Sequence, residues 1–318
     1  MSDSVKLLEG IVQNVEKVIV GKRSAIELTL ISLICNGHVL IEDVPGVGKT
    51  SLVSSVAKSM NASFKRIQFT PDILPSDITG FSVYNQKNGE FEYRTGAIMS
   101  QIILADEINR TSPKTQASLL EVMEESQVTV DGVTHQVPKP FMVLATQNPV
   151  EYLGTYPLPE AQIDRFFMKI TIGYPQPSEE ADILSRFQQG NPVATLQPVA
   201  DGSEILTIQE EVKQIHVDRS LNNYIVDIVS ETRKHPDVVL GSSPRGSLAL
   251  FRASQAWAFY NRRNYVIPED IKKMAVPVLS HRIILRQEAK LKKISPEDII
   301  ASILGRTRVP VVDYHGKK

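Results

Sequence analysis

The chain has 318 residues, 42% of them hydrophobic and 22% charged, a composition typical of a globular protein with room for two domains. The formal net charge is −1, so no overall field attracts it to nucleic acid or to an anionic membrane. A single cysteine excludes a disulfide framework and a cysteine-based zinc site. The sequence starts without a signal-peptide pattern and contains no stretch apolar enough to span a membrane, which favours the cytoplasm.

The first half of the chain alternates between helical and strand patterns. Apolar residues recur at helical spacing over residues 5–19, and a second helix is predicted over residues 23–35. Five apolar runs predict buried strands, at residues 38–42, 64–69, 102–105, 141–146 and 167–172. Further helices are predicted over residues 49–60 and 114–125. This alternation favours a parallel sheet covered by helices on both faces.

Two segments do not fit a plain α/β pattern. In residues 81–93 alternating apolar residues flank Asn88-Gly89, and in residues 128–137 they flank Asp131-Gly132. Both dipeptides supply the positive φ angles of a type I′ turn, so each segment is predicted to be an inserted β-hairpin. The sequence leaves open whether the hairpins are working loops or structural additions.

The character of the sequence changes after Ile172. Residues 173–178 form a predicted linker, and Ser178 is the predicted N-cap of the next helix. From there to about Leu304 the pattern is helical with little strand, and residues 188–202 form a polar loop. We therefore expect one domain over residues 1–175 and a helical domain over residues 176–318.

The turn after the first strand, Pro45-Gly46-Val47-Gly48-Lys49-Thr50, has the composition of a phosphate-binding loop. Its two glycines let backbone N–H groups face inward, and the following helix directs its positive end at the same point. Lys49 is expected to reach the β- and γ-phosphates of ATP, and the Thr50 hydroxyl to bind Mg²⁺. Asp43 stands where the general pattern has its first glycine, which brings a negative charge near the phosphates. An ordinary glycine turn is the alternative.

Acidic residues follow the third predicted strand. Asp106 and Glu107 end an apolar run, and the carboxyl end of a strand in such a sheet lies beside the ligand. Asp106 suits the Mg²⁺ shell and Glu107 the activation of water. Asn148 follows the fourth strand at the same edge and is a candidate to position that water. The alternatives are a solvated strand end for the acids and a turn role for Asn148.

Together these segments resemble the AAA+ ATPases and, within them, the MoxR family. The matching segments are the phosphate-binding loop, Asp106–Arg110, Asn148, Leu158–Phe166 and Ser243–Arg245, within a resemblance that runs from about Val18 to Pro310. The resemblance implies an α/β fold: a P-loop three-layer αβα domain with a five-stranded parallel sheet in the order 5-1-4-3-2, and a C-terminal all-α lid. It also implies a ring, usually a hexamer, with Mg²⁺ and ATP held between subunits.

The resemblance gives two arginines a role. Arg165 resembles the arginine finger that reaches the γ-phosphate in a neighbouring subunit, with a local ion pair to Asp164 or Glu160 as the alternative. Arg245 resembles the lid arginine called sensor 2. Ser242 or Ser243 is expected to cap a helix that starts at Pro244, which places Arg245 in the first turn. This independently suggests a phosphate partner, because a cation there opposes the helix dipole. Arg245 is expected to act on its own nucleotide or on a neighbour's.

The nucleotide-contacting set is completed by the backbone of Val20-Gly21, which resembles the segment that brackets adenine. The implied ATP-binding residues are Val20, Gly21, Pro45, Gly46, Val47, Gly48, Lys49, Thr50, Ser51 and Arg245. The implied catalytic residues are Lys49, Glu107, Asn148, Arg165 and Arg245.

These assignments predict an enzyme in which ATP hydrolysis remodels, assembles or matures a client protein complex. The family implies chaperone-like proteins that often work with a von Willebrand A-domain partner. One alternative is a nucleic-acid motor of the same AAA+ branch, against which the near-neutral charge counts. The other is a nucleotide-gated binding module with little turnover, against which Glu107, Asn148 and Arg165 count.

Overall fold

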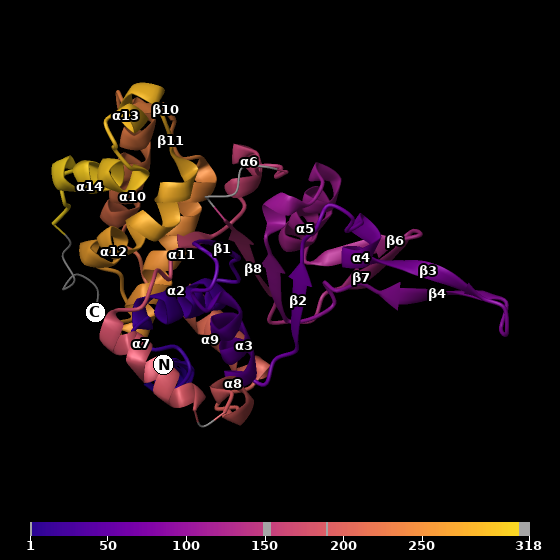
Figure 1. Ribbon diagram of the computed structural model, residues 1–318. Helices are drawn as coiled ribbons and strands as arrows, with labels where there is room; N and C mark the ends of the chain where they lie inside the picture. Colours follow the sequence, from indigo (N-terminus) through magenta and orange to yellow (C-terminus); the bar gives the residue numbers. More distant parts are fainter. Residues whose placement is uncertain (1, 149–153, 189, 312–318) are drawn as a thin grey trace.

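The computed structural model describes residues 2–148, 154–188 and 190–311 (Figure 1). A five-stranded sheet forms its centre, with the spatial order β2-β5-β8-β1-β9. The strands are β1 (Val39–Glu42), β2 (Phe64–Gln68), β5 (Ile102–Asp106), β8 (Met142–Gln147) and β9 (Met168–Ile170). All neighbouring pairs are parallel. Numbered along the chain from the opposite edge, this is the predicted order 5-1-4-3-2, which is confirmed.

Helices cover both faces of this sheet. The first face carries α1 (Ser2–Glu16), α2 (Arg23–Ile34) and α3 (Lys49–Ser59), and the second carries α5 (Pro113–Glu125). Alternate strand residues enter the two cores, because successive side chains of a strand point to opposite faces. In β5, for example, Leu104 packs with α1–α3 and Ile103 packs with α5. The predicted three-layer αβα arrangement is confirmed.

Both predicted hairpins are present. The first pairs β3 (Gly80–Asn85) with β4 (Glu90–Thr95) after the short helix α4 (Pro75–Thr79), and it projects away from the body of the protein (Figure 1). The second pairs β6 (Gln127–Val130) with β7 (Val133–Gln136).

The turns of the two hairpins differ. Asp131 and Gly132 have φ angles of 49° and 79°, as a two-residue type I′ turn requires. The type I′ prediction is wrong for the first hairpin, where four residues connect the strands and Gly89 has the positive φ, 72°. That loop closes through the Gly89 N–H, which donates to the Asn85 carbonyl at 2.9 Å.

After β9 the described chain is helical, with one short strand pair, β10 with β11. Between β5 and β9 lie the short η1 (Ile108–Arg110) and α6 (Glu160–Ile163). The later elements are α7 (Pro177–Phe187), α8 (Pro192–Thr195), α9 (Gly202–Lys213), α10 (Arg219–Lys234), β10 (Val238–Leu240), α11 (Pro244–Tyr260), α12 (Pro268–Leu279), η2 (Ser280–Arg282), β11 (Ile284–Leu285), α13 (Gln287–Leu291) and α14 (Pro296–Arg306). Within the described ranges, no helix has both the length and the apolar character of a membrane span.

Two local predictions in this half are wrong. The N-cap of α7 is Gln176, not Ser178, because Pro177 occupies the first helical position and the Glu179 carboxylate accepts the Gln176 N–H at 2.8 Å. The segment expected to be a polar loop contains α8, whose N-cap Asn191 accepts the Val193 N–H at 3.0 Å. In both cases the local cap decides where the helix begins.

Candidate functional site

The phosphate-binding loop connects β1 to α3 in a left-handed backbone conformation. Gly46 and Gly48 have φ angles of 87° and 88°, which glycine adopts without the steric penalty of other residues. A Cβ on Gly46 would meet nothing within 4 Å, so this backbone faces open space that phosphate groups can enter. The Lys49 ammonium lies in the same loop and donates to the carbonyls of Asp43 and Val44, at 2.8 and 3.3 Å. The loop therefore offers a cradle and a cation to an anionic ligand.

Asp43 does not leave an uncompensated charge near this cradle. Its side chain is buried, and Oδ2 accepts the N–H groups of Ile172 and Gly173, both at 2.7 Å. Oδ1 accepts the Val44 N–H at 2.9 Å. Three backbone donors therefore stabilise the carboxylate, and they join the start of the loop to the chain that leaves β9.

Asp106, at the end of β5, is held on both carboxylate oxygens. Oδ1 accepts the Thr146 hydroxyl at 2.6 Å. Oδ2 accepts Nε and Nη2 of Arg66 at 3.1 and 2.6 Å. Arg66 comes from β2, whose parallel register aligns it with Leu104 beside the acids. The predicted metal ligand is thus already paired with a cation from the neighbouring strand.

Glu107 has the left-handed backbone conformation, with a φ of 59°, which is uncommon for a residue with a side chain. Its N–H donates to the Thr146 hydroxyl at 2.9 Å. Its Oε2 accepts Gln68 Nε2 at 2.7 Å and Arg110 Nη1 at 3.0 Å. Strained backbone at a candidate catalytic acid is typical of functional sites.

The predicted loop, acids and Asn148 converge on one cavity of about 370 Å³. Its lining residues are Pro45, Gly46, Gly48, Lys49, Thr50, Arg66, Gln68, Asp106, Glu107 and Asn148. We call this the P-loop cavity. Sequence reasoning missed Arg66 and Gln68, although a signal was present, because two polar side chains at positions i and i+2 share one face of an edge strand.

Val47, Ser51 and the segment before Val20-Gly21, also predicted to contact ATP, lie close to the loop. Val47 packs against the apolar core of α1–α3, and Ser51 belongs to the first turn of α3. The segment before Val20-Gly21 runs beside the loop, since the Ile19 Cδ1 atom lies 4.0 Å from the position of a Cβ on Gly48. The Glu179 carboxylate covers Gly21, where an added Cβ would meet it.

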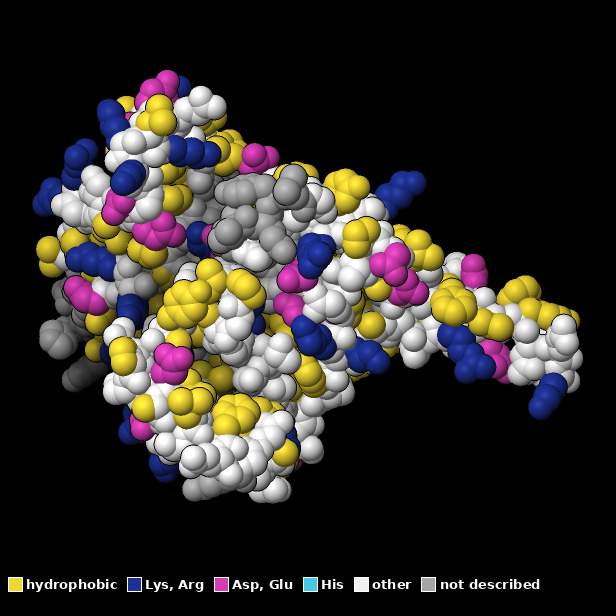
Figure 2. Space-filling model, in the orientation of Figure 1, with side chains coloured by type: hydrophobic (Ala, Val, Ile, Leu, Met, Phe, Trp, Pro, Cys, Tyr) yellow, Lys and Arg dark blue, Asp and Glu magenta, His cyan; other side chains and the backbone are white. Residues whose placement is uncertain are grey.

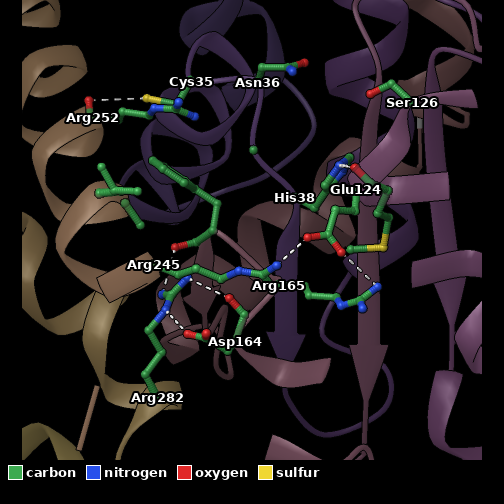
Figure 3. Close-up of a pocket in the computed structure, with 15 residues that line it drawn as sticks. Cys35, Asn36, His38, Glu124, Ser126, Asp164, Arg165, Arg245, Arg252 and Arg282 are labelled. Carbon is green, nitrogen blue, oxygen red and sulfur yellow. Dashed lines mark hydrogen bonds and ion pairs between the residues drawn. The ribbon is translucent and has the colours of Figure 1, made fainter. Parts of the chain in front are cut away.

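Arg165 and Arg245 lie in a second cavity, of about 310 Å³, and within the described ranges neither lines the P-loop cavity (Figure 3). Both pair with Glu124 near the end of α5. Arg165 Nη1 is 3.2 Å from Glu124 Oε2 and donates to the Leu120 carbonyl at 3.2 Å, while Arg245 Nη2 pairs with Glu124 Oε1. We call this the arginine cavity.

The alternative for Arg165 was a local ion pair with Asp164 or Glu160, and the ion pair that Arg165 makes is with Glu124. Asp164, one of the two predicted partners, instead accepts Arg282 Nε at 2.9 Å and the Ser243 hydroxyl at 2.8 Å. Ser243, one of the two serines predicted to cap this helix, caps α11 by accepting the Arg245 N–H at 3.1 Å. Helix α5 supplies the acid for Arg165, because tertiary packing places its C-terminal turn beside that side chain.

Arg282 is almost fully buried behind these residues. Its guanidinium donates to the Phe166 carbonyl at 2.6 Å and to the Asp164 carbonyl at 3.2 Å, in addition to the Asp164 carboxylate. Burial lowers the pKa of Arg282 to about 10, and the charge of Asp164 opposes the shift. The side chain therefore stays cationic at neutral pH and joins η2 to the segment that carries Arg165.

The chain is similar to known proteins along nearly its whole length. Residues 38–168 match the model of the "ATPase family associated with various cellular activities", and residues 230–303 match the AAA lid domain. The uncharacterized protein YeaC of Bacillus subtilis is 56% identical, over 96% of this chain and 95% of the relative. The chaperone MoxR1 of Mycobacterium tuberculosis is 41% identical, over 98% of this chain and 85% of the relative.

A solved structure shows the same fold. It is that of a "putative ATPase" from Cytophaga hutchinsonii, with a TM-score of 0.91 and 42% sequence identity, and the match covers 98% of this chain and 97% of the other. The phosphate-binding loop, the two acids and the helical lid described above are the parts that an AAA+ ATPase requires. The chain therefore belongs to the MoxR family of AAA+ ATPases.

Proposed function

We propose that this ATPase binds Mg²⁺ and ATP in the P-loop cavity and hydrolyses ATP with groups from two subunits of a ring. Lys49 binds the β- and γ-phosphates, while Thr50 and Asp106 hold Mg²⁺. Glu107 activates the water that Asn148 positions. The donor set supports this assignment, since Mg²⁺ in nucleotide sites takes one or two protein oxygens together with phosphate oxygens.

The observation that carries the two-subunit proposal is the separation of the arginines from the P-loop cavity. In addition to Lys49, an arginine at the γ-phosphate stabilises charge in the transition state. Arg66 lines the P-loop cavity but is bound to Asp106. Arg165 and Arg245 line the arginine cavity instead, so they serve the nucleotide of a neighbouring subunit.

The ring, a hexamer in this proposal, transmits ATP turnover to a client protein complex. The two proposed units are residues 1–175, which hold the nucleotide, and residues 176–318, which form the lid. The projecting β3–β4 hairpin is the proposed client contact, because it presents large apolar side chains to solvent (Figure 2). Phe91 is 74% exposed and Tyr84 is 52% exposed. A von Willebrand A-domain protein is the proposed partner.

Mixed rings test the two-subunit site. Arg165→Ala subunits keep Glu107 but offer no finger, whereas Glu107→Gln subunits offer a finger but cannot activate water. Each variant alone is expected to be nearly inactive, and a mixture is expected to recover part of the ATPase activity. Arg219→Ala, which changes an exposed arginine of α10 that lines neither cavity, is the control and should retain activity on its own. Mixtures that co-assemble without recovery would contradict the proposal.

A further inference from the structure

One carboxylate holds both arginines of the arginine cavity. Glu124 uses Oε2 for Arg165 and Oε1 for Arg245, and Figure 3 shows the two guanidinium groups on either side of it. We propose that Glu124 is a positioning residue. It holds the side chains of Arg165 and Arg245 in place to bind the γ-phosphate of the ATP in a neighbouring subunit. This inference rests on the two-subunit site proposed above.

The two arginines reach Glu124 from distant parts of the chain. Arg165 follows α6, whereas Arg245 lies in the first turn of α11 in the lid. Their backbones are joined by Asp164, which binds the Ser243 hydroxyl at the start of α11 and the buried Arg282. This network fixes where the two side chains begin. It leaves the ends of two long side chains to be ordered, which has an entropic cost, although the Leu120 carbonyl also accepts one N–H of Arg165.

Glu124 orders those ends and compensates their charge. Two guanidinium groups brought together repel each other, and a carboxylate between them removes that repulsion. The two oxygens of a carboxylate resemble two oxygens of a phosphate group in geometry and charge. Both arginines are therefore directed at one pair of acidic oxygens before any neighbour arrives.

The cavity around them keeps an excess of positive charge. Its four arginines are Arg165, Arg245, Arg252 and Arg282, and its two acids are Glu124 and Asp164, so the formal balance is four minus two, or +2. An anion is thus attracted even while Glu124 is in place. Arginine is also the side chain best suited to bind phosphate oxygens in pairs.

Partial exposure makes Glu124 suitable for mutation. The side chains of Glu124, Arg165 and Arg245 are 39%, 32% and 49% exposed. Ion pairs of this kind contribute little to the stability of a fold, because solvent screens them. Replacing Glu124 is therefore expected to leave the protein folded, so that effects on turnover can be assigned to the arginines.

The first measurement separates nucleotide binding from turnover. Glu124→Ala should bind a fluorescent ATP analogue with unchanged affinity and lower kcat by roughly 10-fold, less than the ~10²-fold that a 1 Å misplacement can cause. Glu124→Asp should restore part of the loss, since it keeps a carboxylate. Glu125→Ala, on the same helical turn, is the matched control and should leave kcat unchanged. A Glu124→Ala variant as active as the parent, or more active, would overturn the proposal.

Mixed rings then identify the direction of the effect. Glu124→Ala subunits keep their own P-loop and Glu107, so their nucleotide sites should recover next to Glu107→Gln subunits, whose arginine pair is intact. Damage within the mutated subunit's own site would give no recovery. Failure of this mixture alone, where Arg165→Ala with Glu107→Gln recovers, overturns the role of Glu124. Failure of both mixtures overturns the two-subunit site, and this inference with it.

Discussion

The Arg66 guanidinium approaches the Asp106 carboxylate to 2.6 Å, on the residue proposed to bind Mg²⁺. The other carboxylate oxygen accepts the Thr146 hydroxyl, so both oxygens are occupied by protein donors. A metal ion must therefore compete with Arg66 for Asp106. Arg66 is half-exposed, so its long side chain can move into solvent at low cost.

Replacing Arg66 by Ala is therefore expected to lower the Mg²⁺ concentration needed for ATP binding. The shift should be about 3-fold, because partly exposed ion pairs contribute 1 kcal/mol or less. A fluorescent ATP analogue titrated with Mg²⁺ measures it directly. Arg110→Ala is the control, since Arg110 pairs with Glu107 rather than with Asp106. An unchanged or higher Mg²⁺ requirement in the Arg66 variant would show that Arg66 does not compete with the metal.

Replacing Lys49 by Ala is expected to abolish nucleotide binding. Its ammonium group is the cation that the loop itself brings to the phosphates, and Gly46 and Gly48 keep the loop conformation without it. Titration with the same fluorescent analogue measures the affinity, and circular dichroism checks that the fold is retained. If a folded variant bound the ATP analogue with near-normal affinity, the loop would not be the phosphate site.

Replacing Glu107 by Gln is expected to preserve binding of ATP and Mg²⁺ and to slow turnover by at least ~10²-fold, as loss of a general base does. Gln keeps a side-chain oxygen for the Gln68 amide, so the local geometry should survive. Steady-state hydrolysis and analogue binding, measured on one preparation, separate the two effects. Hydrolysis at the parent rate would show that another group activates the water.

The sequence predicted the parts of the site that follow one another along the chain. The loop, the acids after β5 and Asn148 after β8 are each read from a local pattern of strand and turn. Arg66 was missed because it reaches Asp106 across two neighbouring strands. Glu124 was missed for a similar reason, since its contact with the arginines depends on how α5 and the lid pack.

In the two hairpins, too, the local sequence pattern predicted the strands but not a feature that depends on how the strands pair. Alternating residues around Asn88-Gly89 and Asp131-Gly132 predicted both hairpins correctly, because alternation is a local property. The turn type depends on where strand pairing ends. In the first hairpin the last pair is Asn85 with Glu90, which leaves four loop residues rather than two.

His38 makes the stability of the protein depend on pH. Its Nδ1 accepts the Val143 N–H at 3.0 Å, so the neutral ring carries its proton on Nε2 and donates to the Met123 carbonyl at 2.9 Å. Burial lowers the pKa of His38 to about 4 from 6.5, and the Met123 bond opposes the shift. The unfolded chain therefore binds a proton at a higher pH than the folded protein does.

The free energy of unfolding should accordingly be highest above pH 6.5 and should fall as the pH drops towards about 4. His38 accounts for roughly 3 kcal/mol of that loss. The partly buried His281, whose pKa desolvation also lowers, adds to it. Urea unfolding at a series of pH values measures the slope. His38→Gln, which can keep both hydrogen bonds, should give a shallower slope; an equal slope would assign the pH dependence to other groups.

The β3–β4 hairpin is expected to bind the client without taking part in ATP hydrolysis. Tyr84 and Phe91 face each other across the two strands, with ring centroids 5.3 Å apart, and both are largely exposed. Replacing both by Ser keeps the Gly89 turn and removes an apolar surface that water solvates poorly.

Basal ATPase activity of this double variant should stay near the parent value. Proteins captured by the double variant in a Glu107→Gln background should be depleted relative to Glu107→Gln alone, as mass spectrometry can measure. Changing the Asp131-Gly132 turn to Asn-Gly is the control, because it alters the other hairpin and keeps its turn type. Loss of basal turnover or of solubility in the Tyr84/Phe91 variant would instead indicate that these rings support the fold.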